Sequence, residues 1–115
     1  MNTVADPAPL VRVRDCIARD YARPLPLALL AQEAGCSPFH LLRAFRRHYG
    51  VTPREYQQRL RLERARTLLR NPASTITAIA IELGYAHHSH FSAAFRRAYG
   101  VTPRAFRMRH EQGAR

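Results

Sequence analysis

The chain has 115 residues, enough for one compact domain with a modest core or for two very small subdomains that share a helix. Its formal net charge is +11 and all 19 of its basic residues are arginine, which favours a polyanionic partner, nucleic acid first and an acidic membrane surface second. No run of about 18 apolar residues and no secretory signal pattern occurs, so we expect a cytoplasmic, nucleoid-associated protein with no membrane-spanning segment.

The positive charge is concentrated in part of the chain. Residues 1–36 carry no net charge, whereas residues 37–70 carry +7 and residues 71–115 carry +4. The surface that meets the polyanion is therefore expected beyond residue 36. Cys16 and Cys36 are the only cysteines and lack a CxxC spacing, which predicts two free, buried thiols in a reducing compartment.

Proline, glycine and capping residues predict helices throughout the first half of the chain. A helix start at Asp6-Pro7 is followed by apolar residues at helical spacing, and Ser37 is placed to cap the third helix. Thr52 and Glu55 form a capping box before a fourth helix of about 18 residues, or roughly 27 Å. We expect helices over about 7–23, 27–34, 38–48 and 53–70, the second of them beginning at Pro26 without a side-chain cap.

The second half of the chain repeats this plan. The stretch RRHYGVTPR at 46–54 returns as RRAYGVTPR at 96–104. Further helices are expected over about 76–83, capped by Thr75, over 88–98 and over 103–110. Ala105 stands where Glu55 stands in the first copy, so the second capping box lacks its acid. Because no strand-like alternation occurs, we expect an all-α fold of about seven helices in which each copy contains a helix-turn-helix.

The third helix and its counterpart over 88–98 each have an outward face that calls for a partner. At about 100° per residue, Leu41, Ala44, Phe45 and His48 share the inward face of the third helix. The opposite face carries Phe39, Leu42, Arg43 and Arg46, although solvated surfaces do not ordinarily combine an aromatic side chain with a leucine. In the counterpart, Phe91, Ala94 and Phe95 are expected inside, and His88, Ser89, Ser92, Ala93 and Arg96 outside.

Arginine, serine and apolar side chains on one helix face suit the base edges of a DNA major groove. Two such helices, joined by a helix of roughly 27 Å, would lie about one DNA turn of ~34 Å apart, so a monomer could bind two adjacent grooves. The alternative is that Phe39 and Leu42 pack against a missing domain or the N-terminal tail. Phosphate contacts are predicted for Ser37 and for the repeated arginines beside helix ends, which are Arg46, Arg47, Arg54, Arg96, Arg97 and Arg104.

The stretch GYAHHSHFSAAFRRAYGVTPRAFR at 84–107 resembles the signature of the AraC/XylS transcriptional regulators, and residues 27–62 resemble their first helix-turn-helix. The resemblance covers roughly residues 8–111. It implies a seven-helix, bipartite domain that binds double-stranded DNA and regulates promoters, most often as an activator that touches RNA polymerase. Carried over by position, the base-reading residues are Phe39, Leu42 and Arg43 in the first unit and His88, Ser89, Ser92 and Ala93 in the second. Arg61 matches a basic position of the linker helix that is typical of the family, and it is predicted to contact a phosphate.

We divide the chain accordingly into a tail (1–7), a first helix-turn-helix subdomain (8–52), a linker helix (53–71) and a second helix-turn-helix subdomain (72–115). Most members of the resembled family carry an effector-binding domain before this region. The chain is therefore expected to be either a stand-alone short regulator or the C-terminal part of a larger one.

Three other classes of function fit the sequence less well than a DNA-binding regulator. A nucleoid or RNA binder that acts through charge alone needs no base-reading face. A metal or pH sensor would use His87, His88, His90 and either Cys36 or His110, but His88 and His90 diverge by about 200° on a helix and no carboxylate or cysteine pair completes a tetrahedral set. No catalytic triad, paired carboxylates or glycine-rich phosphate loop occurs, so we expect no enzyme, no cofactor and no metal.

Overall fold

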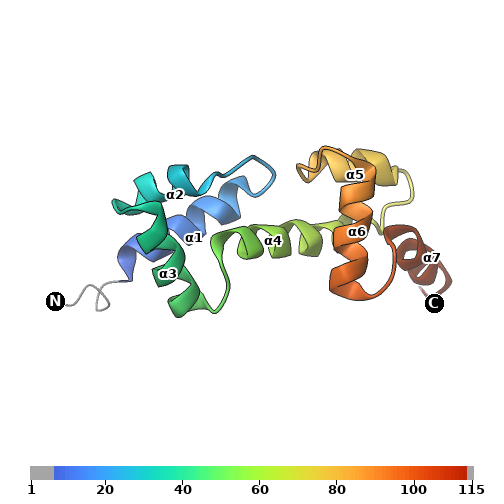
Figure 1. Ribbon diagram of the computed structural model, residues 1–115. Coiled ribbons are helices and arrows are strands. Elements are labelled where there is room, and N and C mark those ends of the chain that lie inside the picture. Colours follow the sequence, from blue (N-terminus) through green and yellow to red (C-terminus); the bar gives the residue numbers. More distant parts are fainter. Residues whose placement is uncertain (1–6, 114–115) are drawn as a thin grey trace. The chain divides into compact units, whose positions relative to one another are not determined.

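The computed structural model describes residues 7–113, and over that range it consists of seven helices and no strand (Figure 1). The predicted all-α fold is therefore confirmed; Asp6, assigned to the start of the first helix, lies outside the described residues. None of these helices combines the length and the apolar character needed to cross a membrane. Their bounds are α1 Ala8–Asp20, α2 Leu27–Ala34, α3 Pro38–Tyr49, α4 Pro53–Leu68, α5 Ile76–Glu82, α6 His88–Tyr99 and α7 Pro103–Gly113.

Side chains cap the helices at the positions that the sequence predicts. Ser37 Oγ accepts a hydrogen bond from the backbone N–H of His40 at 3.1 Å, and Thr75 Oγ1 accepts one from Ala78 at 3.0 Å. Pro26 begins α2 without a side-chain cap, also as expected. Each capping oxygen satisfies one of the N–H groups that the first turn of a helix leaves without a partner, so α3 and α5 begin at defined residues.

The capping box of α4 is complete and that of α7 is half complete. At α4, Thr52 Oγ1 accepts from the N–H of Glu55 at 3.1 Å, while the Glu55 carboxylate accepts from the N–H of Thr52 at 2.9 Å. At α7, Thr102 Oγ1 accepts from the N–H of Ala105 at 3.1 Å, but alanine offers no return bond. Of the predicted second capping box, the structure therefore forms the Thr102 half.

Several predicted helix ends shift by a few residues. The first helix ends at Asp20 rather than near Pro24, because residues 21–23 form a turn in which the N–H of Arg23 bonds the carbonyl of Asp20 at 2.9 Å. The last helix extends to Gly113 instead of ending near His110. Gly50 and Gly100 end α3 and α6 with φ of 82° and 81°, a left-handed conformation that glycine adopts without a Cβ clash.

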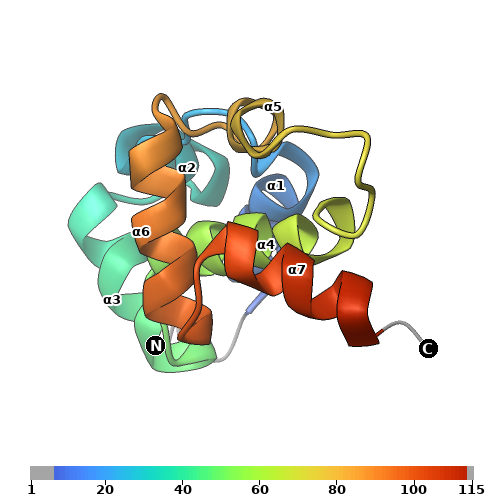
Figure 2. The same ribbon diagram turned by 90° about the vertical axis from the view of Figure 1, so that its right-hand side faces the viewer.

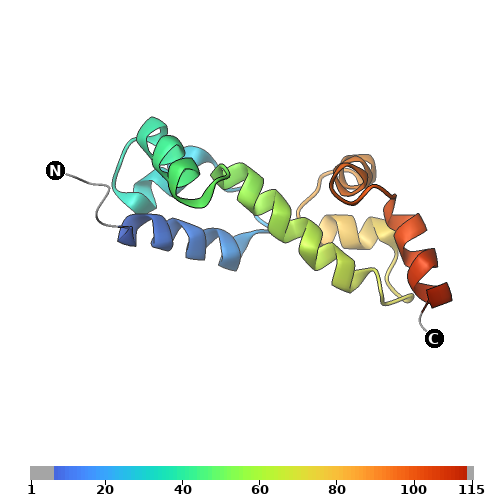
Figure 3. The ribbon, with the colours of Figure 1, turned by 90° about the horizontal axis from the view of Figure 1, so that it is seen from below.

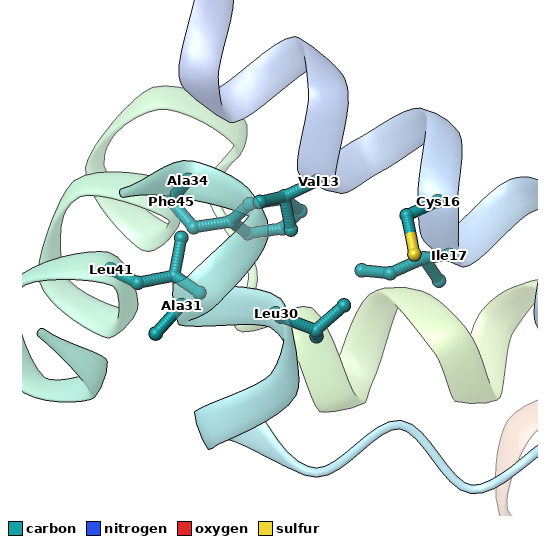
Figure 4. Close-up of a cluster of buried hydrophobic side chains, with 8 residues drawn as sticks. All are labelled: Val13, Cys16, Ile17, Leu30, Ala31, Ala34, Leu41 and Phe45. Atoms are coloured by element: carbon teal, nitrogen blue, oxygen red, sulfur yellow. The ribbon is translucent and has the colours of Figure 1, made fainter. Parts of the chain in front are cut away.

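The chain forms two compact units whose boundary falls within α4, between Leu60 and Arg61. The core of the first unit gathers side chains from α1, α2 and α3, as the labelled residues of Figure 4 show. Tyr56 and Leu60 of α4 pack against it. The buried members are Val13, Cys16, Ile17, Leu30, Ala31, Ala34, Leu41 and Phe45.

The second unit buries the later turns of α4 together with α5 and α6. Leu62 and Ala65 of α4 are buried, as is Leu69 directly after its end, and the rings of Phe91 and Phe95 are fully buried. Figure 2 shows α5, α6 and α7, and α6 contacts both of the other two. α4 is one continuous helix in Figure 3, but its successive turns bury residues in different units, which explains why it lacks a single apolar stripe.

Two predictions about burial were wrong in part. His48 is exposed, although the helical wheel places it with the inward residues of α3; it lies in the last turn, one residue before the helix ends. Cys36 is half-buried rather than buried, since it lies in the turn between α2 and α3, while Cys16 is buried in the core; both thiols are free.

Candidate nucleic-acid interface

α3 has one face in the core and one in solvent. Leu41 and Phe45 are fully buried against α1 and α2, as predicted. On the opposite side Phe39 is 67% exposed, Arg43 is exposed and Leu42 is half-buried. The structure thus leaves an aromatic ring and an arginine together on the outward face of α3.

Phe39 and Arg43 contact one another on that face. They lie four residues apart, one helical turn, and the Arg43 guanidinium carbon Cζ lies 5.4 Å from the centroid of the Phe39 ring. This distance is within the range of cation–π attraction. Because Arg43 makes no hydrogen bond or ion pair with any described residue, its five N–H donors are available to an external acceptor.

α6 repeats the arrangement with smaller side chains. Phe91 and Phe95 are fully buried and Ala94 is nearly so, which confirms the predicted inward face. On the outward side four of the predicted residues are exposed and Ser92 is half-buried; the exposed ones are His88, Ser89, Ala93 and Arg96. This surface offers hydroxyl and imidazole groups where α3 offers a ring and a guanidinium.

Two more histidines stand at the start of α6. His87 and His90 are exposed, and their rings meet edge to face with centroids 5.3 Å apart. Neither residue was predicted to contact DNA; the HHSH spacing is the signal that could have added them to the outward face. Across the described residues no group of three or more His, Cys, Asp or Glu side chains could hold a metal ion.

The predicted phosphate contacts of the repeats are exposed. Ser37 is exposed at the N-terminus of α3. Six arginines are also exposed, and none of them makes a side-chain hydrogen bond or an ion pair with the described residues; the two ion pairs found there join Arg14 to Asp15 and Arg19 to Asp20. The six are Arg46, Arg47, Arg54, Arg96, Arg97 and Arg104.

Arg61 differs from the other predicted phosphate residues. It is half-buried, and its Cζ lies 5.3 Å from the centroid of the Tyr85 ring within the second unit. Burial raises the pKa of Tyr85 to about 12, against the opposing influence of the Arg61 charge. The contact gives Arg61 a packing role in addition to the phosphate role that the family resemblance implies.

The N-termini of α4 and α7 differ in charge. At α4 the Thr52 N–H bonds the Glu55 carboxylate, which lowers the pKa of Glu55; the Thr52 hydroxyl and then Arg46 and Arg59 lower it further. A negative group of the chain itself thus occupies the positive end of this helix. At α7, Ala105 leaves the equivalent place without a carboxylate, so Arg104 stands beside a helix end that remains open to an external anion.

Comparison with known proteins places this arrangement in a family. The family described as "Helix-turn-helix domain" matches residues 30–109. The chain is 39% identical over 72 residues to the HTH-type transcriptional activator RhaS of Escherichia fergusonii, covering 63% of this chain, and 35% identical over 84 residues to the XylDLEGF operon transcriptional activator of Pseudomonas putida, covering 70%. It spans 26% of the length of each.

A solved structure extends the likeness to the whole fold. A transcriptional regulator of Chromobacterium violaceum, described among AraC-type DNA-binding domain-containing proteins, superposes with a TM-score of 0.81 at 30% identity. The match covers 92% of this chain and 95% of that one. The predicted family is thereby confirmed: the chain belongs to the AraC family of helix-turn-helix transcriptional regulators.

Proposed function

We propose that the chain is a sequence-specific double-stranded DNA-binding domain that regulates transcription. The observation that carries the proposal is the outward face of α3, where the exposed Phe39 and Arg43 stand opposite the buried Leu41 and Phe45. An isolated monomer gains nothing from an exposed aromatic ring, whereas a major groove offers it thymine methyl groups and offers the arginine guanine acceptors. α6 has the same division into two faces, which gives each unit one recognition helix.

In this proposal base edges and phosphates are bound by different residues. Arg43 donates two hydrogen bonds to a guanine, and Phe39 and Leu42 contact apolar base atoms. The outward residues of α6 contact the bases of a second major groove. The exposed arginines around the helix ends bind phosphates, which fixes register and orientation but carries no sequence information. Arg61 contributes its charge from a packed position beside Tyr85. The α6 residues with proposed base contacts are His88, Ser89, Ser92 and Ala93.

We further propose that one chain places α3 and α6 in two adjacent major grooves without dimerising. A protein that carries two recognition helices has no need of a second copy to bind two half-sites. Its place of action would be the nucleoid in the cytoplasm, and no enzymatic activity is proposed, because the relatives are regulators by name. Two of them are activators, so activation with contact to RNA polymerase is the proposed outcome.

The rival function is a nucleic-acid binder that relies on charge alone. The net charge of +11 supports it, but it leaves the exposed Phe39 ring without a role. Selection of bound duplexes from a random pool separates the two. Our proposal predicts enrichment of two short sequence blocks about one helical turn apart. A pool that binds well but shows no enriched sequence would favour the charge-only function.

A further inference from the structure

We infer that Phe39 is a positioning residue for Arg43: its ring holds the guanidinium in place on the outward face of α3 before DNA arrives. The inference rests on the proposed function and adds to it a means by which α3 presents Arg43 to a base. It concerns how Arg43 is prepared for binding, whereas the proposed function concerns only what it binds.

The geometry of α3 supplies the contact. The two residues occupy successive turns of one face, and the Arg43 Cζ lies 5.4 Å from the ring centroid. Phe39 is 67% exposed and packs into no core, so its ring is free to serve an outward partner. Arg43 makes no competing hydrogen bond or ion pair with a described residue, and the ring is its one described contact of this kind.

The physical benefit is preorganisation. A free arginine loses much of its rotamer freedom when it binds a base, and a side chain already held in one region loses less. Attraction between a cation and a π face uses none of the five N–H donors in a hydrogen bond, so the fork that recognises a guanine stays available. The ring therefore restricts the arginine without occupying the atoms that read the base.

The second unit shows what the helix is like without this pair. The repeat places Ser89 and Ala93 fifty positions after Phe39 and Arg43, so α6 lacks the ring and the guanidinium together. Neither member of the pair is kept without the other. This joint presence in α3 and joint absence in α6 is what a working pair predicts, whereas two residues with independent roles could be exchanged separately.

Four variants test the inference on a duplex selected from a random pool by the unaltered chain. Phe39→Leu keeps an apolar side chain that can still meet a thymine methyl but removes the π face; Phe39→Tyr keeps the face. We expect Phe39→Leu to weaken binding about 2- to 5-fold, the range of an exposed cation–π contact, and to flatten discrimination at the base pair read by Arg43. Phe39→Tyr should restore both. In an Arg43→Ala background, Phe39→Leu should cost no further affinity.

If the losses from Phe39→Leu and Arg43→Ala multiply, the two residues act independently and the inference is wrong. The inference is also wrong if Phe39→Tyr binds the duplex as weakly as Phe39→Leu does. Since Phe39 is exposed, all the variants should keep the fold, which an unchanged melting temperature would show.

A measurement without DNA separates this inference from the proposed function. In the free protein the Nε–H resonance of Arg43 should carry a ring-current shift and restricted motion, and both should disappear in Phe39→Leu and persist in Phe39→Tyr. An Arg43 resonance that is identical in the unaltered protein and Phe39→Leu would overturn the inference even if sequence-specific binding is established. If the ring-current shift is lost in Phe39→Leu but the random pool yields no enriched sequence, the contact between Phe39 and Arg43 is supported and sequence-specific binding is refuted.

Discussion

Gln57 and Arg107 occupy equivalent positions in the two repeats, and both donate hydrogen bonds to backbone carbonyls that follow an earlier helix. Gln57 Nε2 donates to the carbonyls of Tyr21 and Arg23 at 3.0 and 2.7 Å, one and three residues beyond the end of α1. Arg107 donates from Nε to Leu69 at 3.0 Å and from a terminal nitrogen to Asn71 at 3.2 Å, one and three residues beyond the end of α4.

These bonds show that α4 has a different counterpart in each unit. Its first turns, which carry Gln57, correspond to α7, because both begin with the Thr-Pro turn and both bond the carbonyls after an earlier helix. Its last turns correspond to α1, because the acceptor carbonyls follow directly after both helices. Each unit is thus built from four helical segments, and α4 serves both.

Removing either side chain should destabilise its unit. Arg107→Ala leaves the part-buried carbonyl of Leu69 without its partner, and we expect a loss of about 1–3 kcal/mol in the free energy of unfolding. Arg107→Gln tests whether the shorter side chain used in the first unit can replace it. Urea unfolding measures the loss. Arg109→Ala, at an exposed neighbour, is the control and should stay within about 0.5 kcal/mol; equal losses in the two alanine variants would contradict the role given to Arg107.

Completing the second capping box should stabilise α7. Ala105→Glu would allow a carboxylate to accept from the N–H of Thr102, as Glu55 does from Thr52. We expect a gain of ~0.3–1 kcal/mol, the usual contribution of such a terminal device, measured by thermal unfolding. The same variant should weaken DNA binding, because the carboxylate would repel a phosphate at this helix end. Unchanged DNA affinity would remove the α7 N-terminus from the proposed interface.

The raised pKa of Tyr85 predicts that the protein loses stability at alkaline pH. Burial raises its pKa from its ordinary value of 10 to about 12, so the folded state holds the phenol proton more tightly than the unfolded state. The resulting stabilisation is fully present below pH 10 and is lost as the pH rises through 12. Unfolding measured across this window should show a steeper decline for the unaltered protein than for Tyr85→Phe. Parallel declines would mean that the Tyr85 hydroxyl is no less solvated than in the unfolded chain.

The fold followed closely from the residues that end and cap helices. Ser37, Thr52 and Thr75 were predicted to cap and do so, since a hydroxyl at such a position bonds an N–H of the next turn whatever packs around it. The hydrogen bonds of Arg107 could not be predicted, because the acceptor carbonyls lie far away in the sequence and become neighbours only when the helices pack.

The candidate site was predictable in its faces but not in its contacts. Helical periodicity separates Phe39 from Leu41 and Phe45 without any knowledge of the fold, and the burial of these residues confirms the separation. That Arg61 packs on Tyr85 depends on the path of the turn between α5 and α6, which periodicity does not describe. The base and phosphate roles themselves stay predictions.

Salt dependence of DNA binding tests the proposed phosphate contacts. None of the six exposed arginines forms an ion pair with a described residue, so each can release counterions when it meets a phosphate. If most are used, the logarithm of the binding constant should fall against the logarithm of salt concentration with a slope of about −5. Arg96→Ala should make the slope shallower by about one. A slope between zero and about −2 would be too shallow for contacts by both units.

The central claim, that the outward face of α3 reads sequence, is tested most directly by comparing Arg43→Ala with Arg47→Ala. Both arginines are exposed on α3, but only Arg43 lies on the Phe39 ring. On the selected duplex Arg43→Ala should cost ~1–3 kcal/mol and remove discrimination at one base pair, whereas Arg47→Ala should weaken selected and scrambled duplexes alike. Equal weakening of the two duplexes by Arg43→Ala would contradict the claim, because Arg43 would then bind a phosphate.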